Sequence, residues 1–109
     1  MTPQRGEVWW VNLDPTQGSE IRKTRPCLVL TANVLNRTRQ TLVVVPFSTA
    51  AGGHPPITVP VTCRGKRAVA AVDQVRAIAK HRLRTRIETA SSETMRAVIA
   101  ALSEILELR

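Results

Sequence analysis

The chain has 109 residues, the usual size of one domain, so we expect a single domain over residues 1–109. Hydrophobic residues make up 43% and charged residues 22%, and apolar runs such as residues 42–46 are too short to cross a bilayer. The first residues lack the apolar stretch of a secretory signal, which predicts a cytoplasmic protein without a membrane span. Cys27 and Cys63 have no Cys or His near them at metal-ligand spacing, so buried thiols are favoured over a disulfide or a metal site.

The positive charge is concentrated in the body of the chain. The formal net charge is +8 at pH 7. Residues 1–87 hold 14 Lys and Arg against 4 Asp and Glu, a balance of +10, whereas residues 88–109 hold 2 against 4, a balance of −2. Such a body attracts polyanions, with nucleic acid first, acidic protein segments second and anionic membranes third. The alternative is a cationic protein whose charge serves solubility alone.

The first two strands are predicted from alternation and turn chemistry. Residues 7–13 alternate between two faces, which places Trp9 and Trp10 on opposite sides of a strand. Turn-forming residues fill positions 14–24, a loop that is longer than a hairpin needs, and long loops often carry function. A second strand is predicted at residues 26–30, where the opening proline fits a strand start.

The middle of the chain continues with short strands. A cap and a helical turn are predicted at residues 31–36. Three further strands are predicted at residues 41–45, 57–61 and 68–73. The first of these three is continuously apolar, so we expect a central strand, ended by Pro46. Residues 48–56 are small, with Gly and Pro, and predict a loop, whereas residues 64–67 predict a basic turn.

An amphipathic helix is predicted at the C-terminal end, after a basic stretch at residues 80–86. Ser91 starts it, and an apolar stripe recurs at helical spacing through Met95, Val98, Ile99, Leu102, Ile105 and Leu106. The opposite face carries Glu93, Arg96, Glu104 and Glu107. Five short strands followed by a helix predict an α+β fold, a small bent sheet or barrel with helices at one side. Few aromatic residues are available for the core, so we expect a dimer to supply part of the buried surface.

Two polar positions stand out at the ends of the predicted strands. Arg25 ends the long loop directly before a strand, and Ser48 and Thr49 directly follow the central strand. Strand ends beside loops often face one cleft, and a guanidinium with hydroxyls can hold a phosphodiester. The alternative is that Arg25 is one of sixteen cations and that the hydroxyls cap a turn. His54 and His81 lie in different segments and form no metal pair that the sequence indicates.

Four blocks of sequence, in order, span nearly the whole chain. They are RGEVWWVNLDP at 5–15, GSE and TRPCLVL at 18–20 and 24–30, VVVPFST at 43–49, and VDQVRAI at 72–78. Together they resemble the MazF/PemK/Kid toxins. The resemblance implies an SH3-like β-barrel of about five to seven strands with a C-terminal helix, which acts as a homodimer. It further implies a metal-independent, cofactor-free endoribonuclease on single-stranded RNA, which inhibits translation and growth and is neutralised by a MazE-like antitoxin.

The resemblance also assigns roles to individual residues. It implies catalytic roles for Arg25 and Ser48, with Thr49 as the neighbouring candidate. It further implicates the acid Glu20 and the pair Asp73 and Gln74.

This sequence departs from the family pattern at two positions. Ser19 stands where some members carry His, and Ala71 stands where some carry Arg. A mechanism that uses those two groups as stabiliser and acid cannot operate here unchanged.

The chemistry of metal-free RNA cleavage constrains these roles. The ribose 2′-OH attacks the adjacent phosphorus, which leaves 2′,3′-cyclic phosphate and 5′-OH ends. Arg25 suits stabilisation of the charged phosphorane but stays protonated and is a poor base. Ser48 suits a hydrogen bond to a phosphate oxygen, and Asp73 or Glu20 is the candidate proton acceptor. For Asp73 the alternative is a structural pair with a neighbouring Arg.

Binding is expected to rest on loop cations. The RNA-binding candidates are Arg22, Lys23, Gln74, Arg64, Lys66 and Arg67. A Trp could stack on an unpaired base, but a core position is favoured for both Trp9 and Trp10. A flexible acidic antitoxin segment would compete for the same cleft by charge.

Two other functions remain open at this point. One is a non-enzymatic gyrase poison of the CcdB type, which has the same fold and acts by binding. The other is an inactive RNA-binding relative, which the departures at Ser19 and Ala71 suggest.

Overall fold

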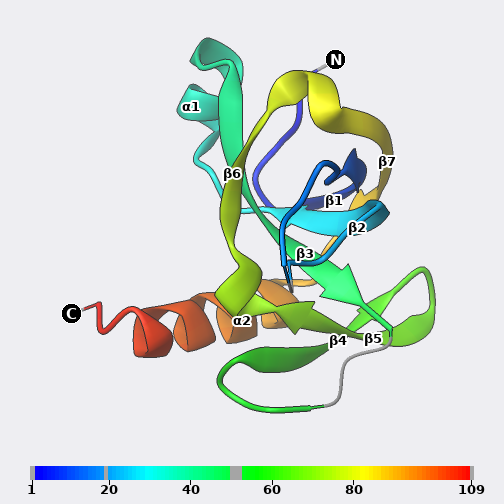
Figure 1. Ribbon diagram of the computed structural model, residues 1–109. Coiled ribbons are helices and arrows are strands. Elements are labelled where there is room, and N and C mark those ends of the chain that lie inside the picture. Colours follow the sequence, from blue (N-terminus) through cyan, green and yellow to red (C-terminus); the bar gives the residue numbers. More distant parts are fainter. Residues whose placement is uncertain (1, 19, 50–52, 109) are drawn as a thin grey trace.

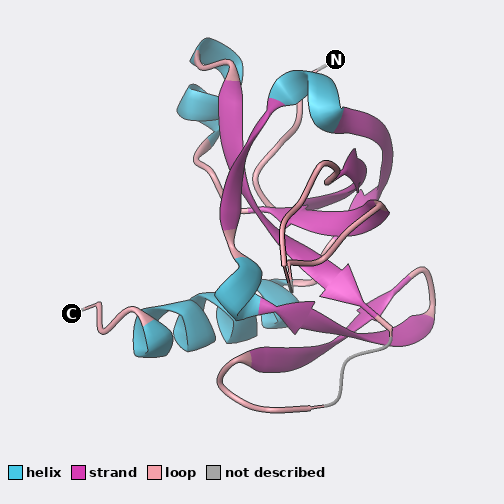
Figure 2. Ribbon diagram, in the orientation of Figure 1, coloured by secondary structure: helices cyan, strands magenta, loops and turns pink. Residues whose placement is uncertain are grey.

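The fold is a curled antiparallel sheet with a long helix along one side (Figures 1 and 2). The computed structural model describes residues 2–18, 20–49 and 53–108. These residues form seven strands, two α-helices and two 3-10 turns: β1 (Glu7–Asn12), β2 (Thr24–Val29), α1 (Asn33–Thr38), β3 (Thr41–Ser48), β4 (Thr58–Cys63), β5 (Lys66–Ala71), η1 (Val72–Gln74), β6 (Arg76–Ala79), η2 (Lys80–Arg82), β7 (Leu83–Thr89) and α2 (Ser92–Ile105). The predicted α+β class, with a bent sheet of five to seven strands and a C-terminal helix, is confirmed.

β3 is the central strand, as its apolar run predicts. The sheet order is β4-β5-β3-β2-β1-β7, and β6 also pairs with β3. The prediction that Pro46 ends this strand is wrong, because β3 continues to Ser48. On one side β3 pairs with β6 as far as Val44 and with β5 from Phe47 onward, so Pro46 lies where the partner changes. A residue without an N–H is tolerated there because no paired residue on that side needs its amide.

The sequence missed two strands and misplaced the ends of others. β6 falls between the last predicted strand and the basic stretch at 80–86, where no element was predicted, and β7 begins within that basic stretch. β7 pairs with β1 at the edge of the sheet and keeps cations such as Arg84 and Arg86 exposed, so it lacks the alternation that marks a half-buried strand. β4 runs to Cys63 and β5 begins at Lys66, within the predicted basic turn at 64–67, which leaves only Arg64 and Gly65 in the turn.

Two apolar clusters form the core because successive residues of β1 and β2 point to opposite faces. Val8 and Leu28 belong to the cluster that packs against Val98 of α2, whereas Trp9 and Cys27 belong to the second cluster. Both cysteines are buried and free, as predicted. Burial raises the pKa of the Cys27 thiol to about 12, although the charge of Arg76 opposes the shift.

Helix α2 is capped by Ser91 and buries its apolar face, as predicted. The Ser91 side chain accepts a hydrogen bond from Thr94 N at 3.0 Å, and Val98 and Ala101 are buried. The expected polar face is exposed at Glu93, Arg96, Glu104 and Glu107. The predicted apolar stripe is wrong at its end, because the helix stops at Ile105 and leaves Leu106 53% exposed. No helix in the described ranges is long and apolar enough to cross a bilayer.

Helix α1 is short and is not capped as predicted. Its N-cap is Ala32, which has no side-chain cap hydrogen bond. The neighbouring hydroxyl of Thr31 instead bonds to β3, accepting from Val43 N at 2.6 Å. The cap prediction failed because the side chain found a backbone partner in the sheet rather than in the helix.

An ion pair joins the two strands β1 and β7. Glu7 accepts hydrogen bonds from Gln4 N at 2.8 Å, Trp9 Nε1 at 3.0 Å and Arg86 Nε at 2.7 Å. Partial burial is the largest single influence on the pKa of this carboxyl and raises it. The three donors together outweigh burial and hold the pKa below the ordinary value of 4.5. Over the part of the chain that the structure describes, this is the one ion pair.

Candidate functional site

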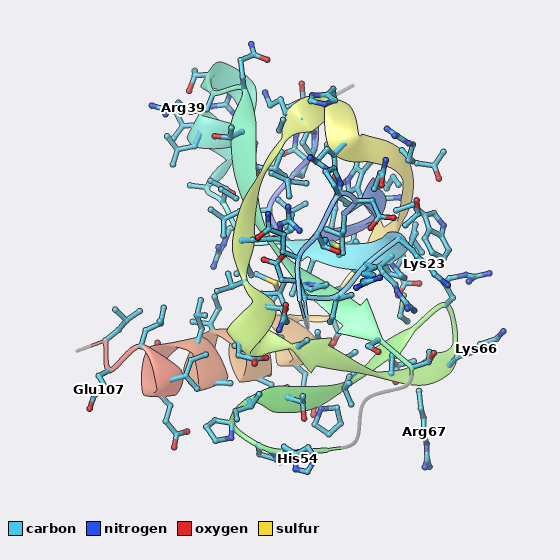
Figure 3. The ribbon with its side chains drawn as sticks, viewed as in Figure 1. Lys23, Arg39, His54, Lys66, Arg67 and Glu107 are labelled. Atoms are coloured by element: carbon cyan, nitrogen blue, oxygen red, sulfur yellow. The ribbon has the colours of Figure 1, made fainter. Side chains whose placement is uncertain are left out.

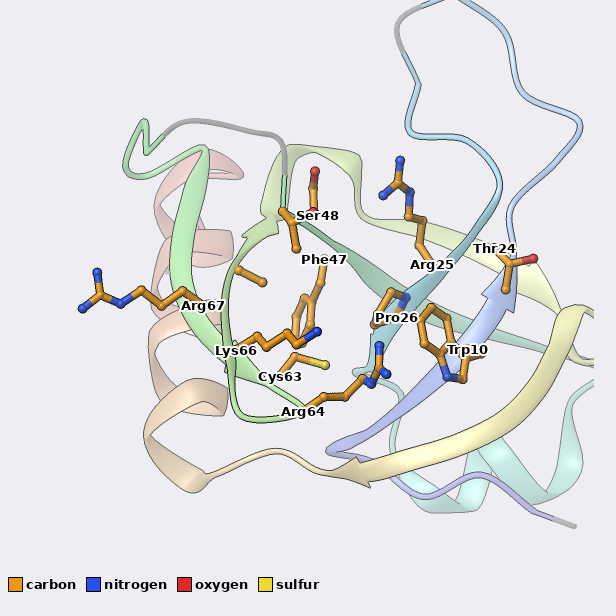
Figure 4. A pocket seen from close by; sticks show the side chains of 12 residues that line it. Trp10, Thr24, Arg25, Pro26, Phe47, Ser48, Cys63, Arg64, Lys66 and Arg67 are labelled. Carbon is orange, nitrogen blue, oxygen red and sulfur yellow. The ribbon is translucent and has the colours of Figure 1, made fainter.

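A pocket of about 220 Å³ opens at the end of the central strand (Figure 4). Four segments build it: β1, the start of β2, the end of β3 and the β4–β5 hairpin. Its lining residues are Trp10, Thr24, Arg25, Pro26, Phe47, Ser48, Thr49, Cys63, Arg64, Lys66, Arg67 and Ala68. The pocket is therefore lined by Arg25, Ser48 and Thr49, the first three catalytic candidates, which come from the start of β2 and from the end of β3 and the residue after it.

Arg25 and Ser48 stand at one rim of this pocket, on the neighbouring strands β2 and β3 (Figure 4). Arg25 is half-buried near the start of β2, opposite Val11 of β1, and its Nε donates to Arg22 O at 3.2 Å. Ser48 is 9% exposed at the last position of β3, and Thr49 is exposed beside it. The paired strands fix both backbones, so the guanidinium and the hydroxyls are presented from rigid positions.

The β4–β5 hairpin brings three more cations to the pocket. Cys63 pairs with Lys66, so Arg64 and Gly65 form a two-residue turn, and both have positive φ, 56° and 72°. Arg64, Lys66 and Arg67 are exposed, and Lys66 and Arg67 extend outward from the hairpin (Figures 3 and 4). No carboxylate from the described residues lines this pocket. Four cations with no carboxylate among the described lining residues make it a site for a negatively charged ligand.

Comparison with known proteins assigns the chain to a family. Residues 4–106 match the family model of the PemK-like, MazF-like toxin of type II toxin-antitoxin system. The chain belongs to this toxin family. It is 31% identical over 105 residues to the endoribonuclease toxin MazF of Escherichia coli strain K12, covering 95% of this chain and 94% of that one. It is 35% identical over 114 residues to the endoribonuclease MazF9 of Mycobacterium tuberculosis, covering 96% and 93%.

A shorter match is closer in sequence. The chain is 47% identical over 51 residues to the endoribonuclease PemK of Escherichia coli, which covers 47% of this chain and 37% of that protein.

Solved structures of a MazF and of a mycobacterial endoribonuclease share the fold. A crystal structure of MazF from Deinococcus radiodurans superimposes with a TM-score of 0.89 at 24% identity, covering 99% of both chains. An endoribonuclease in complex with its cognate antitoxin, from a mycobacterial species, gives 0.81 at 22% identity and covers 98% of this chain and 97% of that one. At these identities the comparison supports the fold of the toxin.

The acidic candidates of the toxin lie in a second, smaller pocket. Glu20, Asp73 and Gln74 line a pocket of about 110 Å³ together with Arg76, and it shares no lining residue with the Arg25 pocket. One Glu20 oxygen accepts from Gln17 N at 2.7 Å and so holds its own loop. Asp73 is exposed. The structure thus divides the predicted catalytic set between two pockets.

Two predicted RNA contacts lie outside both pockets. Arg22 and Lys23 are exposed in the loop before β2. The backbone of Lys23 has a structural role, because its N–H donates to Asp14 Oδ1 at 3.2 Å and its carbonyl accepts from Leu13 N at 2.9 Å. Their side chains are exposed and can contact a ligand outside the pockets.

The two departures from the family pattern have different outcomes. Ser19 lies outside the described residues. Ala71 ends β5 and is 4% exposed, so a small apolar residue fills a core position there. His54 precedes β4 and His81 lies in η2, and within the described ranges no group of three His, Cys, Asp or Glu residues gathers at metal-binding distance.

Sequence reasoning missed two residues: Trp10, which lines the pocket, and Glu88, which lies beside it against the backbone of Arg64. The core prediction is right for Trp9, which is 3% exposed, but Trp10 is half-buried and lines the pocket. The alternation of β1 carried the signal, since it sends the two rings to opposite faces. Glu88 of β7 accepts from Arg64 N at 3.2 and 3.4 Å, a contact over 24 residues that no sequence pattern indicates.

Cys63 lies in the wall of the same pocket. Burial raises the pKa of its thiol, and the nearby carboxylate of Glu88 adds to the shift, whereas Arg64 opposes it. A thiol held in its neutral form contributes packing to the pocket and is a poor nucleophile.

Proposed function

We propose that the chain is a sequence-specific endoribonuclease toxin that cleaves single-stranded RNA without a metal ion. Its membership of the PemK/MazF toxin family supports the activity, and its relatives are named as endoribonucleases. The observation that carries the mechanism is the convergence of Arg25, Ser48 and the hairpin cations in one pocket. The substrate follows from this chemistry, because the pocket is built for a phosphodiester.

Cleavage uses the substrate as its own nucleophile. The 2′-OH oxygen forms a bond to the adjacent phosphorus, the bond from phosphorus to the 5′-oxygen breaks, and the leaving oxygen takes up a proton. The products are a 2′,3′-cyclic phosphate and a 5′-OH. This reaction needs no water and no cofactor, so the protein must align the ribose, stabilise the phosphorane and move two protons.

Arg25 stabilises the phosphorane, and Ser48 orients the phosphate. A guanidinium makes two parallel hydrogen bonds to phosphate oxygens and keeps its charge throughout the reaction. Its Nε is held by the Arg22 carbonyl, which directs the terminal nitrogens. Ser48 hydrogen-bonds a phosphate oxygen from the neighbouring strand β3, and Thr49 is the adjacent hydroxyl.

The proton acceptor comes from the neighbouring pocket. Both side chains are exposed, and Asp73 is favoured over Glu20 because one Glu20 oxygen is occupied by Gln17 N. An RNA strand that passes from the Arg25 pocket to the second pocket brings its ribose toward Asp73, and Gln74 then contacts the same nucleotide.

The RNA backbone lies along the basic hairpin and loop. Arg64, Lys66 and Arg67 contact phosphates on one side of the cleft, and Arg22 and Lys23 extend the surface past the second strand. Binding of this kind weakens steeply as salt rises, because each neutralised phosphate releases counterions.

The positive charge supports an antitoxin partner, whereas exposed apolar side chains support a homodimer. An acidic flexible segment of a MazE-like antitoxin would occupy the basic cleft and exclude RNA. A mycobacterial structure with this fold is an endoribonuclease bound to its cognate antitoxin. Val34 and Leu35 on α1 and Leu106 and Leu108 after α2 are exposed apolar side chains that a second copy could cover. Light scattering at micromolar concentration tests the dimer, and a monomer would refute it.

The deciding experiment compares cleavage by the wild type and by Arg25→Ala. Long single-stranded RNA is incubated with each protein in excess chelator, and cut positions and end groups are mapped. The wild type should cut at one short recurring word and leave 5′-OH ends, whereas Arg25→Ala should lose about 100-fold or more of the rate. Arg37→Ala is the matched control, because Arg37 is exposed on α1 and does not line the pocket. No cleavage by a folded wild type would refute the proposal, and inhibition of DNA gyrase would then be tested.

A further inference from the structure

We propose that Trp10 is a stacking platform for the nucleobase next to the scissile phosphate, and that Arg64 covers this ring until RNA displaces it. The inference rests on the proposed function and adds a residue to its substrate-binding site. The Arg64 guanidinium carbon lies 5.3 Å from the centre of the Trp10 ring, in the pocket that also holds Arg25 and Ser48 (Figure 4). The ring is thus covered by a charge in place of packed core residues.

Trp10 is placed as a binding residue should be. Its neighbour Trp9 is 3% exposed and packs in the core, but Trp10 is half-buried on the other face of β1. Its cross-strand partner is Pro26, so the rigid ladder between β1 and β2 sets the position of the ring beside Arg25. A flat ring fixed from behind and open on one side can accept a base at low entropic cost.

Arg64 can leave the ring without disturbing the fold. Its backbone is fixed, because its N–H donates to both oxygens of Glu88 and its φ of 56° belongs to a tight hairpin turn. Its side chain is exposed, and its guanidinium lies over the Trp10 ring without an ion pair among the described residues. A base that stacks on the ring replaces this cation, and the guanidinium then pairs with the phosphate of the same nucleotide.

The position of Trp10 in the pocket defines which nucleotide stacks on its ring. Every base has a flat face, so stacking contributes affinity and alignment with little dependence on base identity. Because Trp10 lines the same pocket as Arg25 and Ser48, the stacked base belongs to a nucleotide that flanks the reacting phosphate. Loss of the ring should therefore raise KM for RNA, with a smaller change in kcat.

The test uses DNA, which has no 2′-OH and cannot be cleaved by the proposed reaction. A ten-nucleotide oligothymidylate is compared with an abasic oligonucleotide of the same length and charge, by fluorescence anisotropy and by tryptophan quenching. The wild type should bind the oligothymidylate about tenfold more tightly than the abasic strand and should be quenched by it alone. Trp10→Leu should remove the preference, Trp10→Phe should retain part of it, and Arg64→Ala should keep it while weakening both complexes.

Several outcomes would overturn the proposal. An undiminished preference in Trp10→Leu would do so, as would equal quenching of the wild type by both strands. The quenching comparison uses unaltered protein, so it decides the matter even if the Leu variant does not fold. RNA cleavage tested with Arg25→Ala is a separate measurement. If the wild type cleaves RNA but shows no base preference, the platform is refuted and the proposed nuclease stands; if it does not cleave, the nuclease is refuted.

Discussion

The contact between Glu88 and Arg64 allows a sharp test of how the cationic hairpin is positioned. Its two N–O distances are 3.2 and 3.4 Å, so the carboxylate receives one shared and rather long hydrogen bond. A partly exposed bond of this kind contributes about 1 kcal/mol to holding the turn. Glu88→Ala removes the bond and the charge, whereas Glu88→Gln removes only the charge and keeps an acceptor oxygen.

The two variants separate an electrostatic effect from a positional one. Both lose one negative charge beside a pocket of four cations, which should strengthen RNA binding equally in the two proteins. Only Glu88→Ala frees the hairpin tip, so its KM for RNA should exceed that of Glu88→Gln by roughly fivefold, the equivalent of about 1 kcal/mol. Steady-state cleavage of one RNA at fixed salt measures the ratio. Equal KM values in the two variants would refute the positioning role.

Two further predictions concern stability and reactivity. The pKa of Glu7 is lowered in the folded protein, so its ionised form stabilises the fold above about pH 4.5, and this contribution is lost as the pH falls through the lower folded value. Glu7→Gln should therefore flatten the fall in melting temperature measured between pH 6 and pH 3. An unchanged slope would contradict this. Cys27 is fully buried with its pKa raised to about 12, so it should resist iodoacetamide at pH 8 in the folded protein and react after denaturation, as mass spectrometry would show; rapid labelling of folded protein would contradict its burial.

The elements that sequence predicted well are those that burial governs. The apolar run of β3 predicted a strand at the centre of the sheet, and the apolar stripe of α2 predicted which face of the helix is buried. Both predictions are confirmed for these parts of the two elements. β7 could not be found in this way, because an edge strand exposes its side chains and is held by backbone pairing to β1. Pro46 was misread for a related reason, since its tolerance depends on where β3 changes partners.

The site was predicted in part because strand ends meet at predictable places. Arg25 and Ser48 come from the ends of two paired strands, so their meeting followed from the expected sheet. The separation of Asp73 and Glu20 into another pocket depends on the path of the loops, which local patterns do not define. The role of Glu88 depends on the curl of the whole sheet, which brings β7 to the tip of the β4–β5 hairpin.

The scarcity of ion pairs links the stability of the protein to its ligands. The chain has 16 Lys and Arg against 8 Asp and Glu, and within the described residues only Arg86 and Glu7 form a pair. The remaining cations repel one another when the protein is alone, so low ionic strength should lower its melting temperature. A polyanion that binds the folded state relieves this repulsion and raises the melting temperature in proportion to the logarithm of its concentration. An acidic antitoxin would then preserve the fold of the same protein whose activity it blocks.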